Sequence, residues 1–242
     1  MTDYEGFLDL VRRRRSIRRF KPDPVPDEMI EKVLEAARWA PSGANAQPWE
    51  FLVIRDPETK AKVEDLYRTV HPLHYQMELT REERMRHPAA YRPDEIPPIK
   101  DAPALIILLG DPRRKEAYIL SALTMFPERN WYSDLANAFL YMHLAARSLG
   151  LGSHWISTTH HPCVQAMLKQ LLGAPKDYMF YDTMALGYPA YEPRGRTVRD
   201  MGSMVHHERY ERAKHPSDEE VRDFIAAIHM ERVQSRPAPP AS

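Results

Sequence analysis

The apolar run APALIILLGD, residues 102–111, restricts the possible folds more than any other segment of the chain. Its length and the turn residues on both sides predict a strand at the centre of a sheet. We therefore expect the other elements to be arranged in layers around this strand.

Hydrophobic periodicity predicts helices and short strands along the rest of the chain. Helices are expected at residues 4–11, 24–40, 56–70, 133–149, 162–173 and 217–230. Further strands are expected at residues 49–56, 151–159 and 178–189. This order predicts an α+β sandwich rather than a regular array of parallel βαβ units.

The length of 242 residues is compatible with one large domain, which we place at residues 1–214. An amphipathic helix is expected at 215–232, where Ser217 and Glu220 have the spacing of a capping box. The last residues, 233–242, are predicted to be disordered.

The segment 71–98 interrupts the pattern of helices and strands, because it is polar and contains several prolines. We interpret it as a lid insertion with one short helix around the sequence TREERMR, residues 80–86. His71 and His74 have a spacing that could suit a metal, but Pro72 argues against a helix that would present both of them.

The composition excludes several classes of protein. The chain has 34 Lys+Arg and 34 Asp+Glu, so its overall charge does not favour nucleic acid. No apolar run approaches the roughly 18 residues of a membrane span, and Cys163 is a single cysteine. We therefore expect a soluble, cytoplasmic protein without disulfides, membrane partner or nucleic-acid partner. The sequence also lacks GxGxxG, GxxxxGK[ST] and GxSxG motifs.

A block of positive charge nevertheless lies near the N-terminus, where RRRRSIRRF, residues 12–20, has six arginines in nine positions. Such a block is typical of a nucleic-acid or membrane patch, a targeting signal, or a binding site for one compact anion such as a phosphate. The neutral composition and the scarcity of aromatic residues in the block disfavour nucleic acid.

The loop APSGANAQPWEF, residues 40–51, carries a second set of candidate binding residues. Ser42 and Gly43 are small enough for the backbone to approach a flat ligand, and Asn45 and Gln47 can form hydrogen bonds in its plane. Together with the arginines, this loop could hold a planar heterocycle with a phosphate tail. The alternative is an ordinary connection between a helix and a strand.

Four motifs in order make the chain similar to a known family. RRSIRRF, APSGANAQPWEF, LGLGSHWISTT and ALGYPAYEPRGRTVRD resemble the motifs of the nitroreductase family of FMN-dependent flavoproteins, over residues 5–210. The resemblance implies an α/β sandwich with a central, mostly antiparallel sheet flanked by helices. It also implies an obligate homodimer with a swapped C-terminal extension. APSGANAQPW and ISTTHHPC look most like the branch that holds iodotyrosine deiodinases and reductive dehalogenases.

The resemblance also assigns roles to individual residues. Those expected near the FMN phosphate and ribityl chain are Arg14, Arg15, Ser16 and Arg199, with Arg196 as a rival for Arg199. Arg18 is expected near the pyrimidine edge of the flavin. The loop expected to reach the flavin across the dimer interface contributes Pro41, Ser42, Gly43, Asn45 and Gln47. Thr158 and Thr159 match the turn beside flavin N5, where Thr159 is the expected catalytic hydroxyl.

The function implied is that of an FMN-dependent oxidoreductase that uses NAD(P)H to reduce a small aromatic acceptor, a nitroaromatic or a quinone, by ping-pong hydride transfer. The alternative enzyme is a reductive dehalogenase of a halogenated phenol or tyrosine. For that activity the lid should offer a Glu, a Tyr and a Lys, and the available candidates are Tyr75, Glu78, Tyr91 and Lys100, whose spacing departs from the family pattern. A flavin carrier or sensor is the alternative that is not an enzyme.

Overall fold

The computed structural model describes residues 3–87, 98–193 and 195–234. These residues divide into two compact units. Unit 1 comprises Met1–Val70 and Pro97–Glu192, and unit 2 comprises His71–Ile96 and Pro193–Ser242. Unit 1 contains the sheet and most of the predicted site residues.

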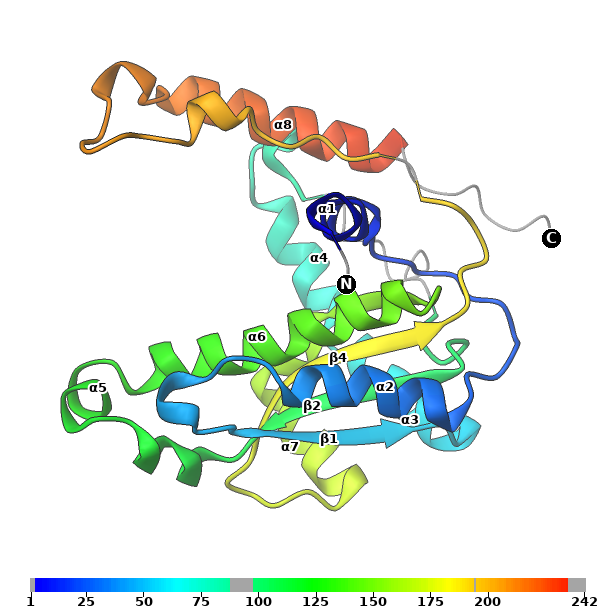
Figure 1. The fold of residues 1–242 in the computed structure, drawn as a ribbon. Coiled ribbons are helices and arrows are strands. Elements are labelled where there is room, and N and C mark those ends of the chain that lie inside the picture. Colours follow the sequence, from blue (N-terminus) through cyan, green and yellow to red (C-terminus); the bar gives the residue numbers. More distant parts are fainter. Residues whose placement is uncertain (1–2, 88–97, 194, 235–242) are drawn as a thin grey trace. The chain divides into compact units, whose positions relative to one another are not determined.

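A four-stranded sheet forms the middle of unit 1 (Figure 1). Its strands are β1 (Trp49–Ile54), β2 (Ala104–Gly110), β3 (Gly152–Ile156) and β4 (Met179–Gly187), in the order β1-β2-β4-β3. Each neighbouring pair is antiparallel. All seven residues of β2 are buried, which confirms that this run is the central strand.

Two pairs of helices cover the two faces of this sheet (Figure 1). The helices α2 (Asp27–Arg38) and α6 (Pro127–Ser148) pack on one face, and α3 (Pro57–Arg68) and α7 (Pro162–Leu172) on the other. Successive side chains of a strand point to opposite faces, so Ile106 and Leu108 of β2 join the first core while Leu105, Ile107 and Leu109 join the second. The predicted α+β sandwich is confirmed.

The shorter elements of unit 1 lie around this sandwich. They are α1 (Tyr4–Arg13), α5 (Leu120–Met125) and the 3-10 turns Gly43–Asn45, Pro112–Ala117 and Ser157–His160. The helix α1 begins at Asp3, whose carboxylate accepts a hydrogen bond from the Gly6 amide at 2.8 Å, and it buries none of its residues. The apolar side chains of Tyr4 and Phe7 are 71% and 50% exposed in the single chain.

Two boundaries in unit 1 differ from the expectation. The helix expected from residue 133 begins at Pro127, because proline fits the first turn of a helix, where no amide hydrogen bond is required. The strand expected to reach Thr159 ends at Ile156, and the next four residues form a 3-10 turn. The Thr159 hydroxyl donates to the Ile156 carbonyl at 3.0 Å, which stabilises the turn over further strand.

Unit 2 combines the predicted lid insertion with the C-terminal region. Its helices are α4 (His71–Leu79) and α8 (Asp218–Gln234), with 3-10 turns at Glu83–Met85, Met201–Ser203 and Arg212–Lys214. The helix predicted for residues 215–232 corresponds to α8. The tail was predicted to be disordered from residue 233, but residues 233–234 still belong to α8, and the rest of the tail lies outside the described residues.

Two expectations for residues 71–86 were wrong. The helix of this segment is α4 rather than TREERMR, where only the turn Glu83–Met85 forms, because Met85 is the one apolar residue available for burial there. Pro72 does not prevent a helix, since it occupies the first turn. His71 and His74 therefore share α4, with ring centroids 6.1 Å apart.

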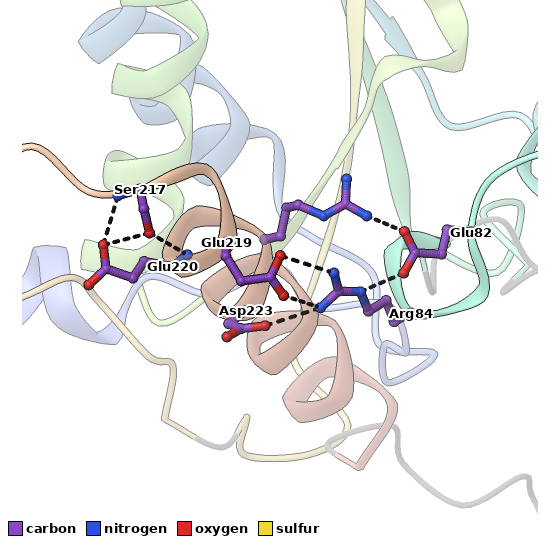
Figure 2. Close-up of polar contacts among 7 residues, drawn as sticks. Glu82, Arg84, Ser217, Glu219, Glu220 and Asp223 are labelled. Atoms are coloured by element: carbon purple, nitrogen blue, oxygen red, sulfur yellow. Dashed lines mark hydrogen bonds and ion pairs between the residues drawn. The ribbon is translucent and has the colours of Figure 1, made fainter.

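A network of charges connects the turn Glu83–Met85 to α8 (Figure 2). Arg84 bonds Glu219 and Asp223 of α8, each at 3.1 Å, and Glu82 at 2.5 Å. Arg222 of α8 bonds the other oxygen of Glu82. Exposed ion pairs are individually weak, but five groups in one network favour a single arrangement of insertion and helix within unit 2.

The start of α8 has the predicted capping box (Figure 2). The Glu220 carboxylate accepts from the Ser217 amide at 2.7 Å, and the Ser217 hydroxyl accepts from the Glu220 amide at 3.2 Å. These bonds satisfy amides that the first turn of the helix leaves unpaired.

We expect Ser217→Ala to destabilise the start of α8 by about 1 kcal/mol, the usual cost of losing a serine cap. Amide hydrogen exchange in the first turn of α8 measures this change. Ser133→Ala, which removes an exposed hydroxyl from the middle of α6, is the matched control. Equal exchange in wild type and Ser217→Ala would show that the cap contributes nothing.

Candidate functional site

The arginine block is attached to the edge strand β3. Ser16 forms a parallel bridge with Ser153, and the Ile17 amide donates to the Ser153 carbonyl at 2.9 Å. The contact is close because Gly152 has no side chain: a Cβ there would meet Ile17 Cγ1 at 2.8 Å. Glycine at this position therefore allows the arginine-bearing backbone to lie against the strand.

Burial and the positive charge of this block both lower the pKa values of two histidines in the same region. Burial lowers the pKa of His143 on α6 to about 3, and the Arg14 charge lowers it further. Burial likewise lowers the pKa of His154 on β3 to about 3, with Arg18 and His143 as further causes. Both imidazoles are therefore neutral at pH 7. The electrostatic potential at this edge of the sheet therefore favours the binding of an anion.

The loop before β1 has an unusual backbone. Ala44, Asn45 and Gln47 have φ angles of 49°, 55° and 47°. For an L-residue this left-handed conformation costs roughly 1–2 kcal/mol, and asparagine tolerates it best. Three such residues in one exposed loop mark a backbone that is held in shape by its surroundings, a feature that clusters at binding sites.

Residues of α6 and of the segment before α5 hold this loop. The Gly43 amide donates to Asp134 Oδ1 at 2.9 Å, and the Tyr118 hydroxyl donates to Asp134 Oδ2 at 2.6 Å. Asn137 of α6 donates to the Pro41 carbonyl at 3.0 Å, and the Gln47 amide donates to the Ser42 hydroxyl at 3.1 Å. Asp134 is 4% exposed, and burial raises the pKa of its carboxyl against the effect of both bonds.

The loop before β1 and the arginine block lie at different positions along the axis of α6. The loop bonds Asp134, whereas the arginine block adjoins His143, which shares a 2.7 Å hydrogen bond with the Ser153 hydroxyl. At 1.5 Å per residue these two positions are roughly 14 Å apart along the helix. One chain therefore presents the predicted cradle as two separate parts.

The third candidate segment is the turn Ser157–His160, where Thr159 is fully buried. Its hydroxyl lies 2.9 Å from the Tyr67 hydroxyl and 2.9 Å from that of Thr183, and these two are 2.6 Å apart. Burial raises the pKa of Tyr67 to about 12, so the phenol stays protonated. Thr159 thus has its hydrogen bonds inside the protein, while Thr158 is the half-buried threonine of the turn.

Sequence reasoning missed the residues that support these segments. Asp134, His143 and Tyr67 lie on helix faces that are otherwise apolar, and each bonds a predicted site segment or its strand. A polar residue within an apolar stripe was the available signal. Asp182, a carboxyl within the apolar strand β4, gave the same signal.

The remaining candidates are distributed between the two units. Arg196 and Arg199 lie in unit 2 and are exposed, so the choice between them stays open. Glu78 also lies in unit 2, where it accepts from Arg81 at 2.8 Å and from the His87 amide at 3.0 Å. Tyr75 belongs to α4, Lys100 belongs to unit 1, and Tyr91 lies outside the described residues.

The described ranges contain neither a metal-binding cluster nor a membrane-spanning helix. Among residues 3–87, 98–193 and 195–234, no cluster of His, Cys, Asp and Glu could hold a metal ion. No helix in the same ranges has the length and apolarity that crossing a bilayer requires.

Comparison with known proteins gives a consistent result. Residues 11–188 match the nitroreductase family. The chain is 31% identical over 188 residues to an Archaeoglobus fulgidus protein named "Putative NADH dehydrogenase/NAD(P)H nitroreductase", covering 78% of this chain and 88% of that protein. It is 30% identical over 198 residues to iodotyrosine deiodinase 1 of Rattus norvegicus, covering 81% of this chain and 66% of the deiodinase.

A solved structure of oxidized iodotyrosine deiodinase bound to FMN and 3-iodo-L-tyrosine has a similar fold. The TM-score is 0.67 at 22% identity, covering 85% of this chain and all of that one.

We expect Gly152→Ala to destabilise unit 1 by about 1–3 kcal/mol, because the new methyl group forces Ile17 and the arginine block away from β3. Urea unfolding measures this loss. Gly195→Ala, whose Cβ would meet nothing within 4 Å, is the control. Unchanged stability in Gly152→Ala would mean that the block is not packed on the strand.

Proposed function

Because this chain belongs to the nitroreductase family, we propose that it is an FMN-dependent oxidoreductase that takes electrons from NAD(P)H and reduces a small aromatic acceptor. The acceptor class is a nitroaromatic compound or a quinone. The observation that carries the proposal is the attachment of Ser16 and Ile17 to β3, which fixes the arginine block beside two neutral histidines.

The residues of unit 1 fit a flavin mononucleotide. The phosphate of FMN carries nearly two negative charges. In addition to burial, the positive charges of Arg14 and Arg18 near β3 lower the pKa values of His143 and His154, respectively. The flat ring requires backbone without bulky side chains, and the exposed left-handed residues Ala44 and Asn45 provide it.

Each predicted segment then has one task. Arg14, Arg15 and Ser16 bind the phosphate and ribityl chain, and Arg18 binds the pyrimidine edge. Arg199, with Arg196 as its rival, is the candidate for a second phosphate arginine. The loop residues Pro41, Ser42, Gly43, Asn45 and Gln47 bind the flavin of a second subunit. The separation of the two segments along α6 supports this shared site, since one chain alone holds them apart.

The turn Ser157–His160 would supply a hydroxyl group to the reacting part of the cofactor. When bound, FMN accepts two electrons from the reduced nicotinamide and passes them to the acceptor. Thr158 is the half-buried hydroxyl available as a donor. Thr159, which sequence reasoning selected, supports it by fixing the turn to Tyr67 and Thr183.

A homodimer follows from the shared site and from the exposed apolar residues of unit 1. In the single chain the exposed fractions are 71% for Tyr4, 50% for Phe7, 44% for Leu140 and 37% for Tyr141. These residues belong to α1 and α6, and a second copy would cover them. The swapped C-terminal extension and a lid function of residues 71–98 remain parts of this proposal.

Reductive dehalogenation is the second candidate, because a deiodinase is among the relatives and has a similar fold. Both carboxylate oxygens of Glu78 already bond within unit 2, one to Arg81 and one to the His87 amide. Arg81 already forms an ion pair with Glu78, so an ammonium group of a substrate would have to share this carboxylate with Arg81. We therefore propose an acceptor without an amino-acid moiety as the first class to test.

We expect the purified protein to be yellow and to weigh about twice the 28.2 kDa of one chain by light scattering. Arg14→Ala should weaken FMN binding by about 2 kcal/mol, because a charge-assisted hydrogen bond is lost. Flavin fluorescence titration measures the affinity. Arg12→Ala, an exposed arginine outside the motif, should bind FMN like wild type. A monomer with stoichiometric FMN would refute the shared site.

A steady-state assay separates the candidate activities. We expect NAD(P)H oxidation to depend on an added nitroarene or quinone, and expect iodotyrosine to be a poor acceptor. Deiodination with dithionite as reductant, without turnover of nitroarenes, would select the dehalogenase. A protein that binds FMN, oxidises no NAD(P)H with any acceptor and shows no deiodination with dithionite would be a carrier or sensor.

A further inference from the structure

Asp182 of β4 is a buried carboxyl group without a charged partner. Its side chain is 7% exposed, Oδ2 accepts a hydrogen bond from Trp155 Nε1 at 2.6 Å, and Oδ1 is buried with no hydrogen-bond partner. Among the described residues, no cation forms an ion pair with it. Burial raises the pKa of Asp182 to about 7, although the bond from Trp155 lowers it. The carboxyl therefore changes its charge near neutral pH.

Trp155 connects this carboxyl to the surface of unit 1. Its indole is stacked on His143 at 5.4 Å with an interplanar angle of 8°, and Phe139 contacts it edge-to-face at 4.6 Å. The residue is nevertheless 37% exposed. One part of the ring is thus fixed in the protein, and another part is accessible to a ligand.

The position of Trp155 along β3 is the key observation. Two residues before it, Ser153 bridges to Ser16 of the arginine block, and two residues after it the turn Ser157–His160 begins. At 3.3 Å per residue, β3 spans roughly 13 Å between these two points. Trp155 therefore lies between the part of the site assigned to the phosphate and the part assigned to the reacting ring.

We propose that Asp182, which is held by Trp155, makes the affinity of this site for FMN depend on pH. The proposal rests on the proposed function. An ionised Asp182 adds a buried negative charge next to Trp155, between the segments assigned to the phosphate and to the reacting ring, and this charge would oppose an anionic ligand. If the two charges were roughly 10 Å apart at an effective dielectric constant of about 20, the change in affinity would be on the order of tenfold.

The other charged and titratable groups around this pair do not change over the same range. They are Tyr181 on β4, Tyr67 on α3, Tyr132 and His143 on α6, His154 on β3, and Arg14 and Arg18 in the arginine block. The pKa values of His143 and His154 are lowered to about 3, and those of Tyr67 and Tyr181 are raised to about 12. Between pH 5 and 9, only Asp182 in this set gains or loses a proton.

The test is the dissociation constant of FMN as a function of pH, measured by flavin fluorescence. Relative to Asp182→Asn, wild-type protein should lose about tenfold in affinity between pH 5.5 and 8.5, with a midpoint near 7. The asparagine keeps an acceptor for Trp155 Nε1 and removes only the charge. Asp65→Asn, which removes an exposed charge from α3, is the control and should follow the wild-type curve.

A second variant distinguishes the hydrogen-bonded pair from an isolated carboxyl. Trp155→Phe keeps an aromatic ring but removes the donor that lowers the pKa of Asp182, so its midpoint should move to higher pH. In the protein without FMN, the difference in tryptophan fluorescence between wild type and Trp155→Phe should change with the same wild-type midpoint. This measurement does not depend on whether Asp182→Asn folds.

The outcomes separate the inference from the proposed function. Parallel FMN curves for wild type and Asp182→Asn, or a tryptophan signal that is constant from pH 5 to 9, would overturn the role of Asp182 and leave the flavoprotein assignment intact. Failure of wild-type protein to bind FMN at any pH would overturn both.

Discussion

The complete burial of β2 is the constraint on which unit 1 depends. A strand with all seven residues buried cannot have a face in water, so it requires a helical layer on each side. The alternating side chains of β2 supply both cores, one with α2 and α6 and the other with α3 and α7. The candidate site is built at the periphery of these cores, where neighbouring elements end and loops begin.

Polar groups buried within the apolar layers fix the conformation of the loops and turns at the edge of the two cores. Asp134 fixes the loop before β1, and the hydroxyl groups of Tyr67, Thr159 and Thr183 fix the turn after β3. Burying such groups is costly unless they are paired, so each arrangement excludes alternatives that would leave one of them without a partner. The segments proposed to bind the cofactor thus obtain a defined geometry from polar groups that are hydrogen-bonded within the protein.

The sequence was sufficient to predict the helical and sheet layers of unit 1, but it was insufficient to predict the details of the candidate site. The strand β2 was predictable because it is a continuous apolar run between turn residues, and the helix α6 because its apolar residues recur at helical spacing. The sequence prediction that Pro72 prevents a helix was wrong, because the effect of a proline depends on its position in the helix. The end of β3 was predicted too late, because the hydrogen-bond partners of Thr159 are distant in sequence. The left-handed Ala44 could not be foreseen, since alanine by itself prefers the right-handed conformation and tertiary bonds impose the other one.

The bridge between Ser16 and Ser153 has a consequence for the behaviour of the protein in solution. In the order β1-β2-β4-β3, the strand β3 is at one end of the sheet, and a terminal strand exposes unpaired backbone groups on which another chain can polymerise. The Ile17 amide already bonds the Ser153 carbonyl, so the segment that carries the arginines occupies part of this edge. The arginine block therefore leaves fewer backbone groups of β3 available for pairing with another strand.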